Sequence, residues 1–269
     1  MPAPLQLPET FAQRLRKADR PQYGFWINSG SPVACEIAAS AGYDWLLIDA
    51  EHTAYSLETI LELVRITDAY PATPVVRLPK NDVSLIKRYL DLGAQNLMIP
   101  MIDSAEEAEQ AVASMHYPPR GVRGVGSILV RAGRFGGIPN YSEIASESVS
   151  LTLQIESAAG LENLEEICKV DGIDAIFVGP ADLAASMGYM DQPRHPEVAA
   201  AVKHIFDVAR ANDIIVGANS FAKDQAEDYI AAGAAFVAMG ADVQLLANSI
   251  RGLAAEIYGE NPITTPQSY

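Results

Sequence analysis

The feature of this 269-residue sequence that most restricts its fold is a short unit that occurs four times. A glycine after a helix supplies the left-handed conformation that ends it. A continuous apolar run of a few residues is typical of a parallel strand buried on both faces. In each unit a helical pattern ends at a glycine and an apolar run closes six residues later, and the glycines are Gly42, Gly93, Gly172 and Gly233. The repeat therefore predicts strands that alternate with helices.

Other apolar segments complete a set of eight strands: Gly24–Asn28, Pro74–Leu78, Leu151–Glu156 and Ile214–Asn219. Amphipathic helices separate the strands, at 57–68, 83–91, 105–115, 161–169, 196–212, 223–232 and 243–258. Regular units without a linker-like stretch favour a single (β/α)₈ barrel domain over the whole chain, 1–269. The alternative is a doubly wound open sheet, which usually carries a glycine-rich dinucleotide fingerprint that this sequence lacks.

Charge and hydropathy disfavour several functional classes. The chain has 34 acidic and 19 basic residues and a net charge of −15, which argues against nucleic acid or an anionic membrane surface as a partner. No apolar run reaches the ~18 residues that a membrane span needs. The N-terminus lacks the basic and apolar regions of a secretory signal. The two cysteines, Cys35 and Cys168, are too few for a disulfide framework and favour a reducing cytoplasm.

Polar residues follow several of the predicted strands. In a (β/α)₈ barrel the carboxyl ends of the strands form one rim, where the active site lies. Glu156 and Asp182 follow neighbouring strands, so their carboxylates are expected about 5 Å apart and repel one another unless they share a cation. Mg²⁺ and Mn²⁺ prefer such oxygen ligands, and Gln154 has the same parity as Glu156. The alternative is that both acids only cap the helices that follow them.

Arg77 and His52 are the basic candidates on this rim. Arg77 ends an otherwise apolar strand, so its charge needs a partner. It either pairs with an acid on the rim or supplies positive charge to an enolate or carboxylate oxygen. His52 follows Asp49 and Glu51, a setting that suits either a general base or a structural histidine. The remaining histidines are expected at the surface: His116, His195 and His204.

An arginine- and glycine-rich segment interrupts the regular spacing of the units. Its four basic residues lie within fifteen positions of an otherwise acidic chain: Arg120, Arg123, Arg131 and Arg134. Glycine lets a backbone approach a ligand closely, and arginine suits carboxylate or phosphate groups. The segment fits either a ligand-binding loop or a contact between subunits.

Five segments, in this order, resemble the HpcH/HpaI aldolase family and its class II pyruvate aldolases. They are DWLLIDAEH at 44–52, PVVRL at 74–78, YPPRGVRGVG at 117–126, QIE at 154–156 and GPADL at 179–183. The likeness runs from about Gly24 to Tyr258. It implies a (β/α)₈ aldehyde-lyase that reversibly cleaves 4-hydroxy-2-oxo acids to pyruvate or hydroxypyruvate and an aldehyde. It also implies a divalent cation, Mg²⁺ or Mn²⁺, with Co²⁺ as a further possibility.

The resemblance assigns roles to the matching residues. Glu156 and Asp182 are expected to bind the metal, to which the keto acid also binds. Gln154, Asp182 and the backbone at Ala181 are expected to help hold the keto acid. Arg77 is expected to contact the substrate and to stabilise the enolate that forms on cleavage.

The same resemblance makes His52 the catalytic base. The family pairs this histidine with an aspartate, which here is Asp91. Because Asp91 precedes the fourth strand, it is expected at the barrel end opposite His52. A neighbouring subunit of a homo-oligomer, a hexamer by the resemblance, would then supply it. Asp49 and Glu51 are the local substitutes for this partner.

Three alternatives bear on the mechanism. A Schiff-base aldolase needs a desolvated lysine at a strand end, whereas Lys80, the one lysine on the rim, is expected in a solvated loop. A lyase acting on a coenzyme A thioester needs an adenine-nucleotide site. A barrel that binds a keto acid without catalysis is expected to lack a metal ligand or the base. Segments 126–137 and 218–221 differ from the family's usual forms, so the aldehyde and the donor stay open.

Overall fold

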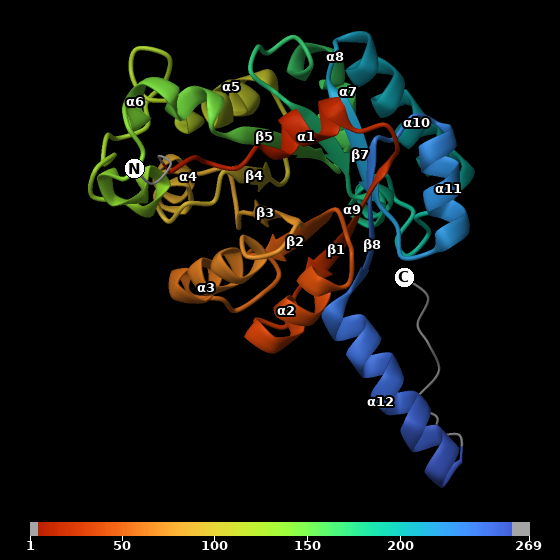
Figure 1. Ribbon diagram of the computed structural model, residues 1–269. Coiled ribbons are helices and arrows are strands. Elements are labelled where there is room, and N and C mark those ends of the chain that lie inside the picture. Colours follow the sequence, from red (N-terminus) through yellow and green to blue (C-terminus); the bar gives the residue numbers. More distant parts are fainter. Residues whose placement is uncertain (1–4, 260–269) are drawn as a thin grey trace.

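The computed structural model describes residues 5–259, and in it eight parallel strands close into a barrel in sequence order (Figure 1). The strands are β1 (Gln22–Ile27), β2 (Trp45–Asp49), β3 (Thr73–Arg77), β4 (Asn96–Ile99), β5 (Ser150–Ile155), β6 (Ala175–Val178), β7 (Ile215–Asn219) and β8 (Phe236–Ala241). The (β/α)₈ barrel that the repeat predicts is confirmed, and the doubly wound sheet is wrong.

Helices follow the strands around the barrel. The longer ones are α2 (Pro32–Ser40), α3 (Leu57–Thr67), α4 (Val83–Asp91), α5 (Ala105–Met115), α10 (Pro196–Ala211), α11 (Lys223–Ala231) and α12 (Asp242–Tyr258). Two of the connections between strands contain extra elements. Between β4 and β5 these are the 3₁₀ helices Arg131–Gly136 and Ala145–Glu147 and the short helix α6 (Tyr141–Ile144), and between β6 and β7 the extra helix is α9 (Pro180–Ser186).

The glycines of the repeated unit adopt the conformation that the sequence predicts. Gly42, Gly93, Gly172 and Gly233 have φ values of 94°, 96°, 103° and 110°. In this left-handed region a side chain would be strained, so glycine ends each helix at low cost. The chain then turns directly into β2, β4, β6 or β8.

The helix expected at 161–169 is wrong as a single element. The chain forms α7 (Ala158–Glu162) and α8 (Leu164–Ile167) instead, separated by Asn163 with φ −92° and ψ 7°. The Asn163 side chain donates to the backbone carbonyl of Asp103 at 2.8 Å. Asparagine readily makes such local bonds in place of helical ones, and periodicity does not reveal this competition.

The core has an inner and an outer layer. The barrel interior is filled by aromatic side chains, among them Trp45, Phe177 and Phe236, all fully buried. Helix α1 (Phe11–Lys17) covers the amino-terminal end of the barrel, where Phe11 lies 5.2 Å from both Trp45 and Phe236 by ring centroid. With this end filled, the opposite rim is the open end.

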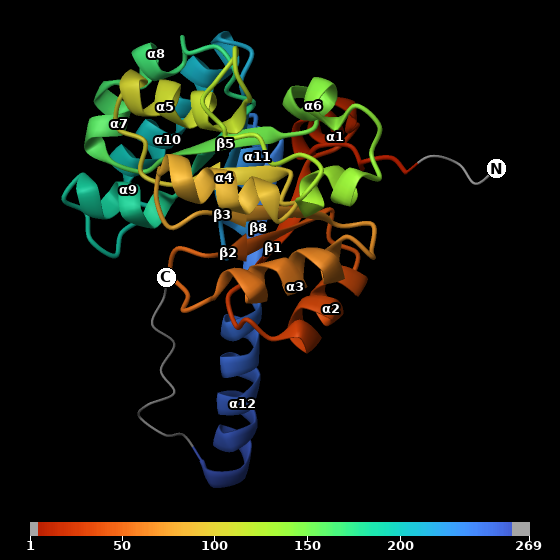
Figure 2. The same cartoon turned by 90° about the vertical axis from the view of Figure 1, so that its left-hand side faces the viewer.

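Helix α12 leaves the barrel (Figures 1 and 2). It follows β8, and none of its side chains is buried. By contrast, the outer layer of the core includes buried residues of α2, α3, α4, α5, α10 and α11.

No helix within residues 5–259 is both long and apolar enough to cross a membrane. The two cysteines, Cys35 and Cys168, are buried free thiols. The expectation that His116 lies at the surface is wrong, because only 5% of it is exposed. His116 ends the amphipathic helix α5 on its buried side, beside Met115.

Candidate active site

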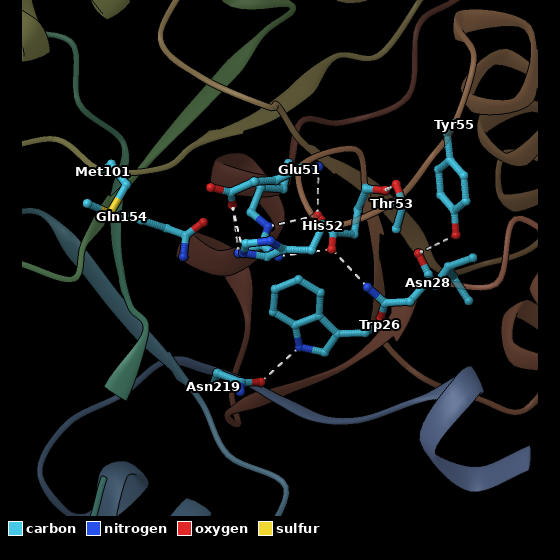
Figure 3. A network of polar contacts seen from close by, with 12 residues as sticks. Trp26, Asn28, Glu51, His52, Thr53, Tyr55, Met101, Gln154 and Asn219 are labelled. Carbon is cyan, nitrogen blue, oxygen red and sulfur yellow. Dashed lines mark hydrogen bonds and ion pairs between the residues drawn. The ribbon is translucent and has the colours of Figure 1, made fainter. Parts of the chain in front are cut away.

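A buried carboxylate lies at the end of β5. Glu156 directly follows the strand and is 3% exposed. One of its oxygens accepts a hydrogen bond from the Met101 backbone at 3.0 Å, and the other accepts one from Gln154 Nε2 at 2.7 Å. The parity argument for Gln154 is thus confirmed in its geometry. Figure 3 shows Met101 and Gln154 on the same side of the polar network.

Glu156 and Asp182 face the same glycine. A Cβ atom on Gly179 would lie 2.5 Å from Glu156 Oε2 and 3.6 Å from Asp182 Oδ2. Glu156 does not cap α7, because Ser157 occupies that position, and no side-chain bond caps α9. The helix-capping alternative is therefore wrong for Glu156, and the two carboxylates approach each other across a residue without a side chain.

Burial, together with the charge of Asp182, raises the pKa of Glu156 to about 8. The amide oxygen of the neighbouring Gln154, Oε1, is also buried and has no hydrogen-bond partner among the described residues. A cation between these oxygen atoms would stabilise the ionised form of Glu156. It would also give the buried oxygen of Gln154 a partner. Residues 5–259 contain no group of three or more His, Cys, Asp or Glu side chains placed to hold a metal ion. The protein oxygens that suit Mg²⁺ or Mn²⁺ here are two carboxylates and an amide, which leaves room for substrate and water.

Arg77 is held rigidly at the end of β3. Its Nε and Nη2 each donate to one oxygen of the fully buried Asp49 at 2.9 Å. The guanidinium carbon also lies 4.5 Å from the centroid of the Trp26 ring. Asn28 Nδ2 donates to Asp49 at 2.8 Å (Figure 3). The ion pair with a rim acid is real, and it fixes the orientation of the guanidinium plane.

The acid and histidine that follow β2 differ in exposure. Glu51 is partly buried, and desolvation raises its pKa. Its Oε2 lies 3.0 Å from Arg77 Nη1 and 3.9 Å from His52 Nε2. The His52 side chain is 66% exposed and lies over the open rim. His52 is thus reachable by substrate or by a second chain.

Asp91 lies away from this cluster. It ends α4, which runs from the rim back toward the amino-terminal end of the barrel, and its Oδ1 accepts from Arg123 Nη2 at 3.0 Å. Arg123 is buried, and its Nε and Nη1 have no partner within residues 5–259. Two other arginines of the segment, Arg131 and Arg134, are near Asp68, at 2.6 and 3.8 Å. Three of the four segment arginines thus pair with acids of this chain.

No lysine in the described part of the chain is buried. Lys80 is exposed and lies 3.7 Å from Asp82, as expected for a loop residue. A lysine that forms a Schiff base has to be desolvated to lower its pKa. The described residues offer none.

Three residues of the rim carry no role in the sequence analysis: Trp26, Asn28 and Asn219. Arg77 was identified as a polar residue at the end of a predicted strand. Asn28 and Asn219 also end predicted strands, so the same criterion applies to them. The contacts themselves join distant parts of the chain. Trp26 Nε1 donates to Asn219 Oδ1 at 2.8 Å, across 193 positions.

The HpcH/HpaI aldolase/citrate lyase family model matches residues 22–249. The chain is 46% identical to a hydroxypyruvate/pyruvate aldolase of Deinococcus radiodurans, over 95% of this chain and 93% of the relative. It is 44% identical to a 4-hydroxy-2-oxo-heptane-1,7-dioate aldolase of Salmonella heidelberg, over 92% of this chain and 94% of the relative.

A solved structure agrees with these sequence matches. An HpcH/HpaI aldolase/citrate lyase family protein from Burkholderia cenocepacia is 38% identical and superposes with a TM-score of 0.86. The alignment covers 91% of this chain and 98% of that one. The family resemblance drawn from five sequence segments is confirmed. The chain belongs to the HpcH/HpaI aldolase/citrate lyase family.

Proposed function

We propose that this chain is a divalent-metal-dependent aldolase that reversibly cleaves 4-hydroxy-2-oxo acids to pyruvate or hydroxypyruvate and an aldehyde. The aldolase activity is supported by relatives of that name over nearly the whole chain. The observation that carries the metal dependence is the pair Glu156 and Asp182, which face one another over Gly179. The neighbouring Arg77 supplies the positive charge that this chemistry also needs.

Glu156, Asp182 and Gln154 are the residues that would hold the cation and the keto acid. Mg²⁺ or Mn²⁺ fits these oxygen donors, and Co²⁺ is an alternative. When bound, the ion supplies a Lewis acid for the keto oxygen. Ala181, in the first turn of α9 beside Asp182, is placed to contact the keto acid through its backbone.

Arg77 stabilises the negative charge that develops on the substrate during cleavage. Retro-aldol cleavage moves an electron pair toward the C2 oxygen, so a fixed cation there is worth more in the transition state than in the ground state. Asp49 and Trp26 hold the guanidinium in place before substrate arrives. Asp49 is thus a positioning residue.

His52 removes the proton from the C4 hydroxyl. Its exposed imidazole lies 3.9 Å from Glu51, which also contacts Arg77, and histidine is the most frequent general base in enzymes. Asp91 orients it from a neighbouring subunit, because Asp91 lies at the other end of the barrel in the same chain. Within residues 5–259, Glu51 contacts His52 at 3.9 Å and is the local candidate for this role.

The chain forms a homo-oligomer, a hexamer by its family resemblance. Helix α12 supports this proposal, because Leu246, Ile250, Leu253 and Ile257 recur at helical spacing and are 59–63% exposed. Such an apolar stripe is normally covered by a second surface. The free thiols of Cys35 and Cys168 fit a cytoplasmic location.

The metal assignment is tested by Glu156→Ala and Asp182→Asn. Both variants are expected to lose Mn²⁺ binding in calorimetry and to release pyruvate from a 4-hydroxy-2-oxo acid at least about 100-fold more slowly, as expected for loss of a metal ligand. Glu162→Ala, on the exposed side of α7, is the control and should leave both unchanged. Full turnover by Glu156→Ala would contradict the assignment.

A further inference from the structure

The end of β7 carries a polar side chain that the mechanism above does not use. Asn219 has the same parity as Ile215, which packs against the interior cluster, and Gly217, where a Cβ would meet the Phe236 ring. Its side chain therefore points into the barrel mouth. Its bond to Trp26, another member of the interior cluster, agrees with this orientation.

The strand register places Asn219 in one row with the carboxylate of β5. Ile155 pairs with Val178, and Val178 pairs with Ala218. One step further, Glu156, Gly179 and Asn219 follow these residues side by side. Neighbouring strands are about 4.8 Å apart, so the backbones of Glu156 and Asn219 are separated by roughly 10 Å. Between them, Gly179 contributes no side chain.

This row has a polar side chain at each end. Glu156 lies on one side, Asn219 lies on the other, and a Cβ on the intervening Gly179 would enter the space beside both carboxylates. A small keto acid held at Glu156 and Asp182 would extend over Gly179 toward Asn219.

The hydrogen bond from Trp26 fixes the orientation of the Asn219 amide. An indole N–H can only donate, so the oxygen of the amide has to face Trp26. The Nδ2 group then points away from the indole. Within residues 5–259, Nδ2 has no hydrogen-bond acceptor. Figure 3 shows Asn219 beneath Trp26, at the border of the polar network.

We propose that Asn219 is a specificity-determining residue whose Nδ2 donates a hydrogen bond to a substrate hydroxyl. This inference rests on the proposed aldolase function. A neutral donor beside an aromatic ring suits a hydroxyl oxygen better than a second carboxylate, which would favour a cation such as arginine. The hydroxyl belongs either to the donor, as at C3 of hydroxypyruvate, or to a hydroxylated aldehyde.

Asn219→Asp and Asn219→Leu test this proposal. The aspartate keeps an oxygen for Trp26 but removes the donor, whereas the leucine removes both. In the first arm, kcat/KM is measured for hydroxypyruvate and for pyruvate with acetaldehyde as the acceptor. In the second, it is measured for glycolaldehyde and for acetaldehyde with pyruvate as the donor. Both variants are expected to lower the preference for the hydroxylated substrate about tenfold in one arm, the effect of one hydrogen bond.

Trp26→Phe and Asn212→Leu are the controls. Trp26→Phe removes the indole N–H and leaves Nδ2 of Asn219 in place, so it should change the preference less than Asn219→Asp does. Asn212 lies at the exposed end of α10, so Asn212→Leu should not change the substrate preference. Melting temperature and Mn²⁺ affinity identify any variant that is misfolded.

The outcomes separate this inference from the proposed function. If both Asn219 variants slow all substrates equally, or if Asn219→Asp keeps the wild-type preference, Asn219 only supports Trp26 and the inference is wrong. If the wild type catalyses no aldol reaction with either donor, the proposed function itself fails. A tenfold loss in the first arm assigns the contact to the donor, and a loss in the second assigns it to the aldehyde.

Discussion

At the scale of single residues, the candidate site consists of side chains at or shortly after the ends of buried strands. This rule selected Arg77, Glu156 and Asp182 as candidates, although helix capping or a salt bridge would explain the same residues from the sequence alone. It did not predict the partners. The contacts of Arg77 with Trp26 and of Trp26 with Asn219 depend on barrel closure, which brings distant strands together.

Asp49→Asn is expected to lower kcat at least about 100-fold, because an amide cannot accept both guanidinium bonds and a small misplacement of Arg77 is costly. The measurement is steady-state pyruvate release from a 4-hydroxy-2-oxo acid. Asp44→Asn is the matched control, since Asp44 accepts two bonds from Arg20 at 2.9 and 2.7 Å and precedes β2, at the barrel end opposite the rim. Asp44→Asn should keep kcat within about twofold of the wild-type value, because exposed ion pairs of this kind contribute little to stability. Equal losses in the two variants would argue against a special role of Asp49.

His116 is expected to make stability depend on pH. Burial lowers its pKa to about 4, and the charges of Arg120 and Arg123 act in the same direction. Between pH 6.5 and 4 the unfolded chain binds a proton that the folded chain does not, so stability falls as the pH falls through this window. Above pH 6.5 the full contribution is present.

Urea unfolding at pH 7 and pH 5 measures this effect. From His116 alone, the wild type should lose roughly 2 kcal/mol more than His116→Gln over this range. His204→Gln, on the exposed face of α10, should behave like the wild type. An identical pH dependence of His116→Gln and wild type would show that this residue does not titrate as described.

At the scale of helices and strands, the sequence predicts where elements exist better than how each one ends. The four glycine-terminated helices follow from a backbone requirement that only glycine meets easily. The break at Asn163 depends on a bond to Asp103, sixty positions away in the chain. Helix α12 has the periodicity of a packed helix, but none of its side chains is buried, and the contact proposed for it lies in another subunit.

Leu246→Glu with Ile250→Glu is expected to break the oligomer, because two charges would be buried in an apolar contact. Light scattering coupled to size-exclusion chromatography measures the mass. Asn248→Glu, on the opposite face of α12, is the control and should keep the wild-type mass. A double variant of unchanged mass would show that α12 does not mediate assembly.

At the scale of the whole molecule, a closed barrel with a filled amino-terminal end directs chemistry to one rim. Fold and family were predictable because the repeat and five ordered segments run through the chain. The proposed pair of His52 and Asp91 could not be placed in one site from the sequence, because the chain separates the two residues by the height of the barrel. If a second subunit supplies Asp91, as proposed, catalysis depends on assembly of the oligomer.

A mixture of His52→Ala and Asp91→Ala subunits tests this connection. Each variant alone is expected to be nearly inactive. Mixed oligomers obtained by co-expression should regain roughly a quarter of the wild-type activity, since random assembly gives some sites both native residues from different subunits. Absence of any recovery would place the partner of His52 within its own chain, with Glu51 as the nearest acid.

The central claim is that Glu156 and Asp182 hold a divalent cation required for aldol cleavage. The most direct measurement is pyruvate release from a 4-hydroxy-2-oxo acid by chelator-treated protein, before and after Mg²⁺ or Mn²⁺ is added, and by protein that was first incubated with the keto acid and borohydride and then separated from both. We expect activity to disappear on chelation, to return with either ion and to be unaffected by borohydride. Activity that persists in chelator, or that borohydride abolishes in the presence of the keto acid, would contradict the account.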